Sequence, residues 1–493
     1  MTELQGVATD SATPVILWFR RDLRLADNPA LDQAHATGRS VVPVYIHDEG
    51  KGLRAQGGAS LWWLDRSLPA LAASLQERGA TLILRRGDSE AELRRLIAET
   101  GADAVFMNRL FEPDAWSRDA DIAHALEGDG VECRGFNGKL LARPGSLLNG
   151  SGGPYKVFTP FMKALRAQAE LPAHTTGPRD LAGTPALASD DLKAWRLSPT
   201  NPDWSKGFDW TPGERGAAEA LKGFVAGGLS DYAAGRDRPS VAATSRLSPH
   251  LHFGEISPWQ AWRAARDAAD AGKVPSNEAD KFIAELIWRD FSAHLLHHFP
   301  TLPEKAFRPE FDALPWREDA PGFAAWTRGQ TGYPIVDAGM RQLWTTGWMH
   351  NRVRMIVASF LIKDLLIDWR QGEEWFWDTL VDADLGSNSQ NWQWVAGSGA
   401  DASPYFRIFN PVTQGQKFDA DGLYVKRWCP ELAQLPARWV HAPWEAPPEV
   451  LRDAGVRLGT TYPRPIVDHA KARLRALAAL KTVSAERHDA AGD

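Results

Sequence analysis

The chain has 493 residues, a formal net charge of −6, 44% hydrophobic residues and 24% charged residues. This length exceeds what one ordinary hydrophobic core serves, so we expect two or three domains. No segment reaches the roughly 18 consecutive apolar residues of a membrane span, and Met1–Pro14 is too polar for a secretory signal. Two cysteines, Cys133 and Cys429, are too few for a disulfide framework or a zinc site, which favours a reducing cytoplasm. The negative charge argues against indiscriminate binding of polyanions but permits a local basic patch.

Short apolar runs alternate with helical segments through residues 13–142. The runs are Val15–Phe19, Val41–Ile46, Thr81–Leu84, Ala104–Met107 and Val131–Gly135. Helical stretches such as Leu61–Glu77 and Glu90–Glu99 separate them. This alternation predicts an α/β domain with a doubly wound parallel sheet. The usual glycine-rich fingerprints for binding dinucleotides or nucleoside triphosphates are absent from the sequence.

The composition changes after this domain. Residues 143–205 are rich in Pro, Gly, Ser, Thr and Ala, which predicts a connector that wraps a surface and holds one helix at Phe158–Gln168. Residues 206–477 contain few β-branched runs and predict an all-α domain. The small and polar residues 478–493 predict a flexible tail that frays.

Two stretches of the predicted helical domain are strongly periodic. Ala279–His298 carries apolar residues at helical spacing, which predicts one long helix. Gly332–Leu366 predicts two helices that are broken around Thr345–Gly347.

Tryptophan is concentrated in the C-terminal part, because 17 of the 22 tryptophans follow residue 200. An aromatic core is one explanation. The other is electron transfer and stacking on flat rings, which suits a large polarisable side chain that oxidises easily. The segment Trp369–Trp394 favours the second explanation, since Asp382, Asp384 and Asn388 lie within it.

One face of the long helix carries Glu285, Trp288 and Arg289 at i, i+3 and i+4. A salt bridge between Glu285 and Arg289 is the structural interpretation. The functional interpretation is a site that stacks a base on Trp288 and binds it through Glu285. The three histidines of this helix have no cysteine or carboxylate pattern beside them, so we predict no metal site.

The segment Trp348–Met355 places Arg352 and Arg354 among apolar neighbours, where unpaired charges are costly. Asp382 and Asp384 are the expected partners. The loop Thr244–Pro249 precedes a predicted helix and is rich in hydroxyls, so it suits either a phosphate group or an ordinary N-cap.

Through these segments the chain resembles the photolyase/cryptochrome flavoprotein family. It is most similar to the bacterial enzymes that repair cyclobutane pyrimidine dimers, of class I or of the plant-cryptochrome-like class III. The resemblance runs from Val15 to about Leu474 in six ordered blocks: Trp18–Arg24 (WFRRDLR), Thr244–Pro249 (TSRLSP), Glu285–Arg289 (ELIWR), Thr331–Ala338 (TGYPIVDA), Trp348–Arg352 (WMHNR) and Tyr405–Pro411 (YFRIFNP).

The resemblance implies a helical domain that holds FAD. The implied FAD-binding residues are Tyr232, Thr244, Ser245, Arg246, Leu247 and Ser248 around the pyrophosphate with Arg289 nearby, and Asn351, Arg354, Asp382, Ala383, Asp384 and Asn388 around the flavin and ribityl chain. Arg354 and Asp382 match an ion pair of the family. Asn388 would lie against flavin N5, where an amide in place of an acid favours a fully reduced, anionic working flavin and therefore a repair enzyme.

The resemblance also implies a DNA substrate whose dimer is flipped out of the duplex, because an enzyme cannot reach a base for chemistry while it is stacked inside the helix. The implied substrate-binding residues are Glu285, Trp288, Asn351, Arg352, Met355 and Trp394 in the pocket, and Arg236 and Gln414 at the DNA phosphates. Trp288 and Trp394 would supply stacking surfaces, which are worth about 1–3 kcal/mol per base. Relatives that repair 6-4 photoproducts have a histidine at the position of Asn351, which argues against that substrate.

The implied reaction is driven by light: the reduced flavin donates one electron to the dimer, the cyclobutane ring opens, and the electron returns. The cofactor supplies the difficult step and the protein orients the reactants. Glu285, if protonated or hydrogen-bonding, would stabilise charge on a pyrimidine carbonyl. Trp392, Trp369 and Trp316 match the family's series of tryptophans that reduces an oxidised flavin.

In the N-terminal domain the family implies an antenna pigment. Asn108 and Glu112 match positions that contact folate, so 5,10-methenyltetrahydrofolate is favoured over a deazaflavin, although Pro303–Lys305 departs from the folate pattern. Ser248–Gly254 is closer to the plant-cryptochrome-like branch.

Two alternatives to dimer repair remain. A cryptochrome-type photoreceptor usually has a long C-terminal extension and an acid at the position of Asn388, and neither is expected here. A plain redox flavoprotein lacks support because no nicotinamide fingerprint occurs. We therefore expect a cytoplasmic, monomeric enzyme, a deoxyribodipyrimidine photo-lyase, that acts on UV-damaged DNA and does not bind membranes.

Overall fold

The computed structural model describes residues 13–50, 52–181, 183–402 and 406–489. The first twelve residues, for which a polar start without a signal is expected, lie outside this range. So do Tyr405 of the last motif and the final four residues of the predicted tail.

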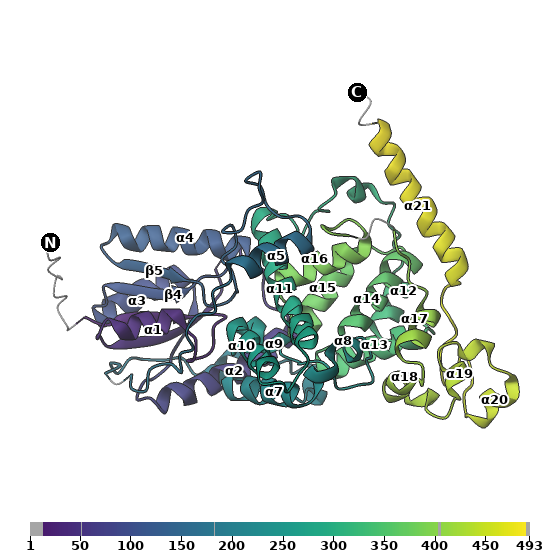
Figure 1. Cartoon of the computed structure of the whole chain (residues 1–493), viewed down its shortest axis with the longest axis horizontal. Helices are drawn as coiled ribbons and strands as arrows, with labels where there is room; N and C mark the ends of the chain where they lie inside the picture. The colour runs from purple at the N-terminus through teal and green to yellow at the C-terminus, as the bar shows by residue number, and fades with distance from the viewer. Residues whose placement is uncertain (1–12, 51, 182, 403–405, 490–493) are drawn as a thin grey trace.

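The N-terminal part forms a five-stranded sheet in the order β3-β2-β1-β4-β5, with all pairs parallel (Figure 1). The strands are β1 (Val15–Phe19), β2 (Val41–Asp48), β3 (Ile83–Gly87), β4 (Ala104–Asn108) and β5 (Glu132–Phe136). All five predicted strands are confirmed, with shifts of a few residues at their ends. β1 is central, since Val15 pairs with Val41 on one side and with Ala104 on the other. Its five residues are completely buried, which explains its continuous apolar sequence.

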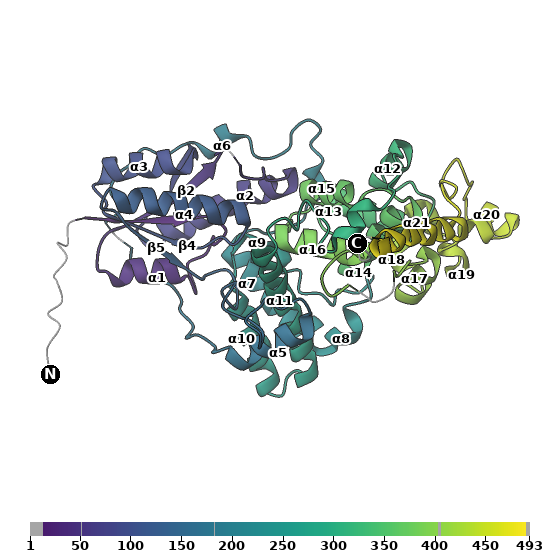
Figure 2. The ribbon, with the colours of Figure 1, turned by 90° about the horizontal axis from the view of Figure 1, so that it is seen from above.

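Helices cover both faces of the sheet (Figures 1 and 2). They are α1 (Pro29–Ala36), α2 (Gly58–Gln76), α3 (Ser89–Thr100) and α4 (Pro113–Gly128). Leu17 of β1 packs in the same cluster as side chains of α1 and α2. Trp18 points to the other face and packs with α3 and α4. This alternation along one strand is the physical basis of the doubly wound architecture.

The connector runs back over the sheet domain before the helical domain begins. It contains α5 (Phe158–Gln168), with the bounds that the sequence predicts, and α6 (Leu192–Trp195). Its main chain donates hydrogen bonds from Leu181 to the carbonyl of Arg78 (2.7 Å) and from Asp190 to that of Leu84 (2.9 Å).

The rest of the described chain is helical. Its helices are α7 (Glu214–Ala226), α8 (Tyr232–Gly235), α9 (Ser248–Phe253), α10 (Pro258–Asp270), α11 (Ser276–His298), α12 (Ala320–Thr327), α13 (Pro334–Thr346), α14 (Asn351–Ser359), α15 (Trp369–Thr379), α16 (Leu385–Ala396), α17 (Pro411–Phe418), α18 (Leu423–Trp428), α19 (Ala437–Val440), α20 (Pro448–Asp453) and α21 (His469–Asp489). The long periodic helix and the pair of helices after it are confirmed as α11, α13 and α14. Gly347 ends α13 in the left-handed conformation (φ 66°), which a glycine adopts without strain.

The predicted tail is wrong for most of its length, because α21 continues to Asp489. Ala472, Ala476, Ala479 and Val483 recur at helical spacing and are 0–6% exposed. Ala479 and Val483 pack in one cluster with Phe311. Ala479 and Val483 of the predicted tail therefore continue the buried stripe of a helix.

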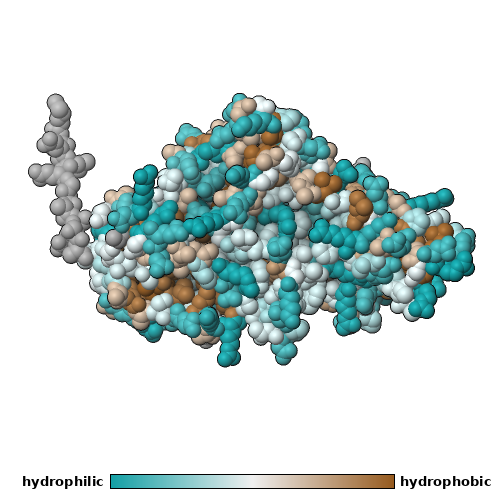
Figure 3. Space-filling model, turned by 90° about the horizontal axis from the view of Figure 1, so that it is seen from below, coloured by the Kyte–Doolittle hydropathy of each residue, from teal (hydrophilic) through white to brown (hydrophobic). Residues whose placement is uncertain are grey.

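The two domains meet along an extensive seam. Gly57, the N-cap of α2, packs against α15, where an added Cβ would lie 2.1 Å from the carbonyl oxygen of Trp377. Leu23, just after β1, donates from its main-chain nitrogen to the carbonyl of Phe253 in α9 (3.1 Å). In the described residues no helix is both long and apolar enough to cross a bilayer. Figure 3 shows that hydrophobic patches on one face are separated by hydrophilic side chains.

Candidate functional site

Five packed helices carry many of the predicted site residues. α16 packs against α11, α14 and α15, and α8 packs against α11. Segments that lie far apart in the sequence therefore meet around one region of the helical domain (Figure 2).

The hydroxyl-rich loop Thr244–Ser248 leads into α9, as predicted. The N-cap of α9 is Leu247, and no side chain of the described residues caps it. The ordinary N-cap interpretation is therefore wrong. The hydroxyl oxygens of Ser245 and Ser248 accept from the main-chain nitrogen of Leu247 (3.3 Å) and from the indole nitrogen of Trp348 (3.4 Å), and each hydroxyl keeps its own proton to donate to an anion. Arg246 is left-handed (φ 52°), and its guanidinium lies 4.0 Å from the ring centroid of Trp210 and 5.5 Å from that of Trp348.

On α11, Glu285 and Arg289 do not form the salt bridge that their spacing permits. Glu285 pairs with Arg236 (2.6 Å) and with Lys281 (3.2 Å). Arg289 donates instead to two main-chain carbonyls, at 2.7 and 3.0 Å, one of which belongs to the sheet domain. Arg236 thus neutralises the carboxylate beside the predicted lesion pocket.

Trp288 and Trp394 are both half-buried, and each has a defined support. The ring of Trp288 stacks on Phe158 of α5, with centroids 3.7 Å apart and planes inclined by 5°. The indole nitrogen of Trp394 donates to the carbonyl oxygen of Asp401 (3.0 Å). One face of Trp288 is therefore occupied by the protein.

Of the two arginines of α14 that were expected to pair with Asp382 and Asp384, one does so. Arg354 donates to both carboxylate oxygens of Asp382 (2.8 and 3.1 Å), and the Asp382 side chain is 4% exposed. Arg352 pairs with Asp237 (2.8 Å) rather than with the second predicted aspartate, and it lies 4.4 Å from the ring centroid of Phe418.

Asp384 faces the sheet domain and not the arginines of α14. It caps α16 by accepting from the main chain of Ser387 (2.9 Å), and it lies 3.9 Å from Lys139 and 3.8 Å from the ring nitrogen of His252. Burial alone would raise the pKa of Asp384, but the His252 ring and the charges of Lys139 and Arg289 hold this pKa well below its usual range.

Asn388 is held by a carboxylate. Its amide nitrogen donates to the main-chain carbonyl (3.0 Å) and to a carboxylate oxygen (2.8 Å) of Glu373. Both partners are acceptors, so the NH2 group must face Glu373. Arg54 of the sheet domain donates twice to the same carboxylate (2.8 and 2.7 Å). No described residue donates to the amide oxygen, which leaves an acceptor for a ligand N–H on this buried side chain.

Two of the remaining predicted residues are buried, Ala383 and Tyr232, and the ring of Tyr232 packs against Phe224 and Phe282. The sulfur of Met355 lies 3.7 Å from Arg352. Asn351 is exposed, and Gln414 is half-buried on α17. Burial raises the pKa of the Tyr232 hydroxyl, so it stays protonated.

The three predicted redox tryptophans differ in burial. Trp392 is 2% and Trp369 is 1% exposed, whereas Trp316 is half-buried. The ring contacts of Trp392 are with Phe376 (5.0 Å) and Trp326 (6.2 Å). Sequence reasoning singled out neither of these two rings.

The predicted antenna residues lie where β1 and β4 end, the point at which the strand order reverses. Open α/β sheets commonly bind ligands there. Here the amide of Asn108 donates to Asp22 (2.6 Å), and Glu112 pairs with Arg21 (2.5 Å) and Lys139 (2.9 Å). Burial would raise the pKa of Glu112, but Lys139 and Arg21 lower it strongly. Both predicted side chains therefore have protein partners, which a pigment would have to share or displace.

Within the described part of the chain, no group of three or more His, Cys, Asp or Glu side chains could hold a metal ion. Burial lowers the pKa of His294 to about 4, so this histidine of α11 is neutral in the core.

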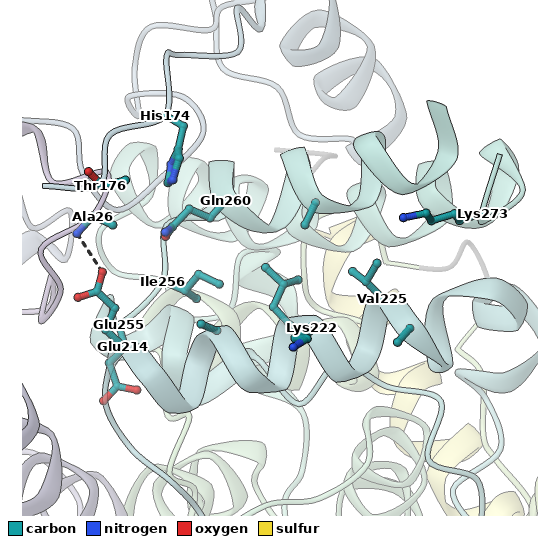
Figure 4. Close-up of a pocket in the computed structure, with 14 residues that line it drawn as sticks. Ala26, His174, Thr176, Glu214, Lys222, Val225, Glu255, Ile256, Gln260 and Lys273 are labelled. Carbon is teal, nitrogen blue, oxygen red and sulfur yellow. Dashed lines mark hydrogen bonds between the residues drawn. The ribbon is translucent and has the colours of Figure 1, made fainter. Parts of the chain in front are cut away.

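A groove of about 720 Å³ lies between α7 and α10 (Figure 4). Its apolar lining includes Leu221 and Val225, and its polar lining includes Lys222, Lys273 and Gln260. None of the predicted flavin or DNA residues lines it.

Comparison with known proteins covers both domains. The family described as "DNA photolyase" matches residues 15–179, and the one described as "FAD binding domain of DNA photolyase" matches residues 282–482. The chain is 55% identical over 473 residues to a deoxyribodipyrimidine photo-lyase of Agrobacterium fabrum, covering 95% of this chain and 98% of that protein. The chain belongs to the photolyase/cryptochrome family. Its helical domain is an FAD-binding domain.

The chain is also similar to a photolyase of known structure and to a plant cryptochrome. A crystal structure of a bacterial class III photolyase from Agrobacterium tumefaciens superposes with a TM-score of 0.93 at 54% identity, over 97% of this chain and all of that one. Cryptochrome-1 of Arabidopsis thaliana is 39% identical over 475 residues, which cover 93% of this chain and 69% of that protein.

Arg54, Glu373, Phe158 and Asp401 are the contacts that sequence reasoning missed. No local pattern signals them, because each acts on a site residue from another element. None of the six family blocks contains any of the four.

Proposed function

We propose that this chain is a deoxyribodipyrimidine photo-lyase, which repairs cyclobutane pyrimidine dimers in DNA with the energy of light. The observation that carries the proposal is Asn388. Its amide is oriented by Glu373, so the side chain offers an acceptor oxygen and has no acidic proton to give. Such a group favours a cofactor whose N5 is already protonated, which is the reduced form that repair requires.

The residues of the site fit FAD. The pair Arg354 and Asp382 and the free amide oxygen of Asn388 would hold the flavin ring, and the uncapped start of α9 together with the hydroxyls of Thr244, Ser245 and Ser248 would hold the pyrophosphate. When bound and reduced, FAD supplies one electron to the substrate on excitation.

The protein's part in the reaction is to bind and orient. Trp288 and Trp394 would stack on an extruded dimer. Glu285 pairs with Arg236 and would lie beside a pyrimidine carbonyl, to which its carboxyl group would donate a hydrogen bond when it carries a proton. Arg352 would contact the lesion, and Gln414 the DNA backbone.

The assignment of Trp392, Trp369 and Trp316 to the reduction of oxidised flavin is likewise a proposal. Burial of the first two shields them from water, and partial exposure of Trp316 allows its oxidised form to exchange with solvent reductants.

The antenna pigment has no assigned step. Asn108 and Glu112 already bind protein partners, so we assign neither of them to a pigment. The preference for a folate over a deazaflavin stays a prediction, which the near-UV absorption of the purified protein tests. A cytoplasmic location and a monomeric state also stay predictions.

The test is repair by the purified holoprotein. A duplex with a single thymine dimer should be restored under near-UV or blue light and stay unrepaired in the dark. A flavin-loaded protein that is photoreduced but restores no dimers would contradict the proposal and favour a photoreceptor of the cryptochrome type, the second candidate, which the 39% identity to Cryptochrome-1 supports.

A further inference from the structure

Asp401 connects the two predicted stacking tryptophans. Its carbonyl oxygen accepts the indole N–H of Trp394 (3.0 Å). Its carboxylate accepts the main-chain N–H of Phe158 (3.3 Å), and the ring of Phe158 lies flat against Trp288 at 3.7 Å. Asp401 thus contacts Trp394 directly and Trp288 through Phe158.

The backbone around Asp401 is held firmly. Asp401 is left-handed (φ 52°), which an aspartate tolerates better than most residues. The N–H groups of Ser398 and Gly399 both donate to the carbonyl of Gln393 (3.1 and 3.0 Å). Gly399 has no room for a side chain, because an added Cβ would lie 2.8 Å from the nitrogen of Trp394. These contacts hold the loop that leads to Asp401 against the end of α16.

The start of α5 depends on this carboxylate. The N-cap of α5 is Val157, whose side chain cannot cap, and it is 46% exposed. Asp401 instead accepts the first N–H of the helix and places a negative charge at its positive end. Because Phe158 is the first residue of α5, this contact positions the ring that supports Trp288.

We propose that Asp401 and Phe158 are positioning residues that set the spacing of Trp288 and Trp394 around an extruded pyrimidine dimer. The inference rests on the proposed function. Neither residue is a catalytic residue. The expected consequence is selectivity for the lesion, since stacking acts on a flipped dimer and not on undamaged duplex.

The test compares four variants of the flavin-loaded enzyme. Asp401→Gly keeps the backbone carbonyl and the left-handed conformation but removes the carboxylate. Phe158→Leu removes the stacked ring and leaves the loop intact. Asp401→Asn keeps an acceptor oxygen and serves as the rescue. Asp453→Asn, an exposed change on α20, is the control.

The readouts are dark binding to a duplex with one thymine dimer, dark binding to the same duplex undamaged, flavin content, and the repair rate at saturating substrate. We expect Asp401→Gly and Phe158→Leu to weaken binding of the damaged duplex by about 3- to 10-fold, since part of one stacking contact is lost. Binding of undamaged DNA, flavin content and the saturated rate should stay within about 2-fold of the wild type, and Asp401→Asn should bind damaged DNA like the wild type.

If Asp401→Gly and Phe158→Leu both prefer the damaged duplex over the undamaged one as strongly as the wild type does, the inference is overturned. A variant that loses both its flavin and its preference for the damaged duplex would also overturn it, because the contact would then serve general stability. A wild type that does not distinguish the two duplexes would remove the proposed function itself, and this inference with it.

Discussion

Breaking the ion pair between Arg354 and Asp382 should weaken the binding of FAD. In Asp382→Asn the side chain keeps its shape but loses its charge, so Arg354 retains one acceptor where it had two, at 2.8 and 3.1 Å. Removing one partner of a fully buried pair costs about 3–5 kcal/mol. The Asp382 side chain is 4% exposed but that of Arg354 is 24% exposed, so water compensates part of the loss.

We therefore expect a loss of about 2–3 kcal/mol in flavin binding, which is roughly a 30- to 150-fold increase in Kd. The assay is titration of flavin-free protein with FAD, followed by flavin fluorescence. The matched control is Asp280→Asn on α11, where the carboxylate is 42% exposed and lies 3.5 Å from two arginines. Exposed pairs contribute about 0–1 kcal/mol, so this change should leave the Kd nearly unaltered. A lower melting temperature in Asp382→Asn at unchanged FAD affinity would refute the reasoning, because the pair would then be purely structural.

Two further changes test other parts of the site, and a third tests Asp290, a buried carboxylate of α11. Glu285→Ala should lower repair per absorbed photon by about 10-fold while FAD stays bound, measured by repair yield and flavin absorbance; loss of FAD would show a structural role. Trp316→Phe should slow photoreduction of oxidised flavin and leave repair by pre-reduced enzyme nearly intact, measured by transient absorption; an equal loss of both contradicts the assignment. Burial raises the pKa of Asp290 from 3.8 to about 7, so the folded state binds more protons between these values and stability falls as pH rises through them. Asp290→Asn, which can still accept from Ala142, should remove that loss and raise the melting temperature at about pH 8; a melting curve that depends on pH as in the wild type would argue against this.

Local order was predictable because it depends on near neighbours in the chain. Alternating apolar runs predicted the five strands, and the 3.6-residue period predicted α11, α13 and α14. The tail after Ala478 shows the limit of this reasoning. Ala479 is small enough to suggest fraying, and only the surface that it packs against makes it part of the buried side of α21.

Partners of charged residues were less predictable. Spacing on α11 permits a bond between Glu285 and Arg289, yet Arg289 reaches the main chain of Lys139 in the other domain and Glu285 takes Arg236. Each choice depends on which group a neighbouring element brings within about 3 Å, and sequence spacing carries no information on that distance.

The amino-acid sequence by itself determined the family and the two kinds of domain, because these are properties of residue type and local pattern, and it predicted the residues that would hold a flavin and a lesion. Tertiary structure decided how those residues are supported. Arg54 donates across 319 residues of chain to Glu373, which orients Asn388, and Asp401 reaches Phe158 across 243 residues. Such contacts form only when the packed helices bring distant segments to hydrogen-bonding distance, so they depend on the whole fold and not on any single stretch of it.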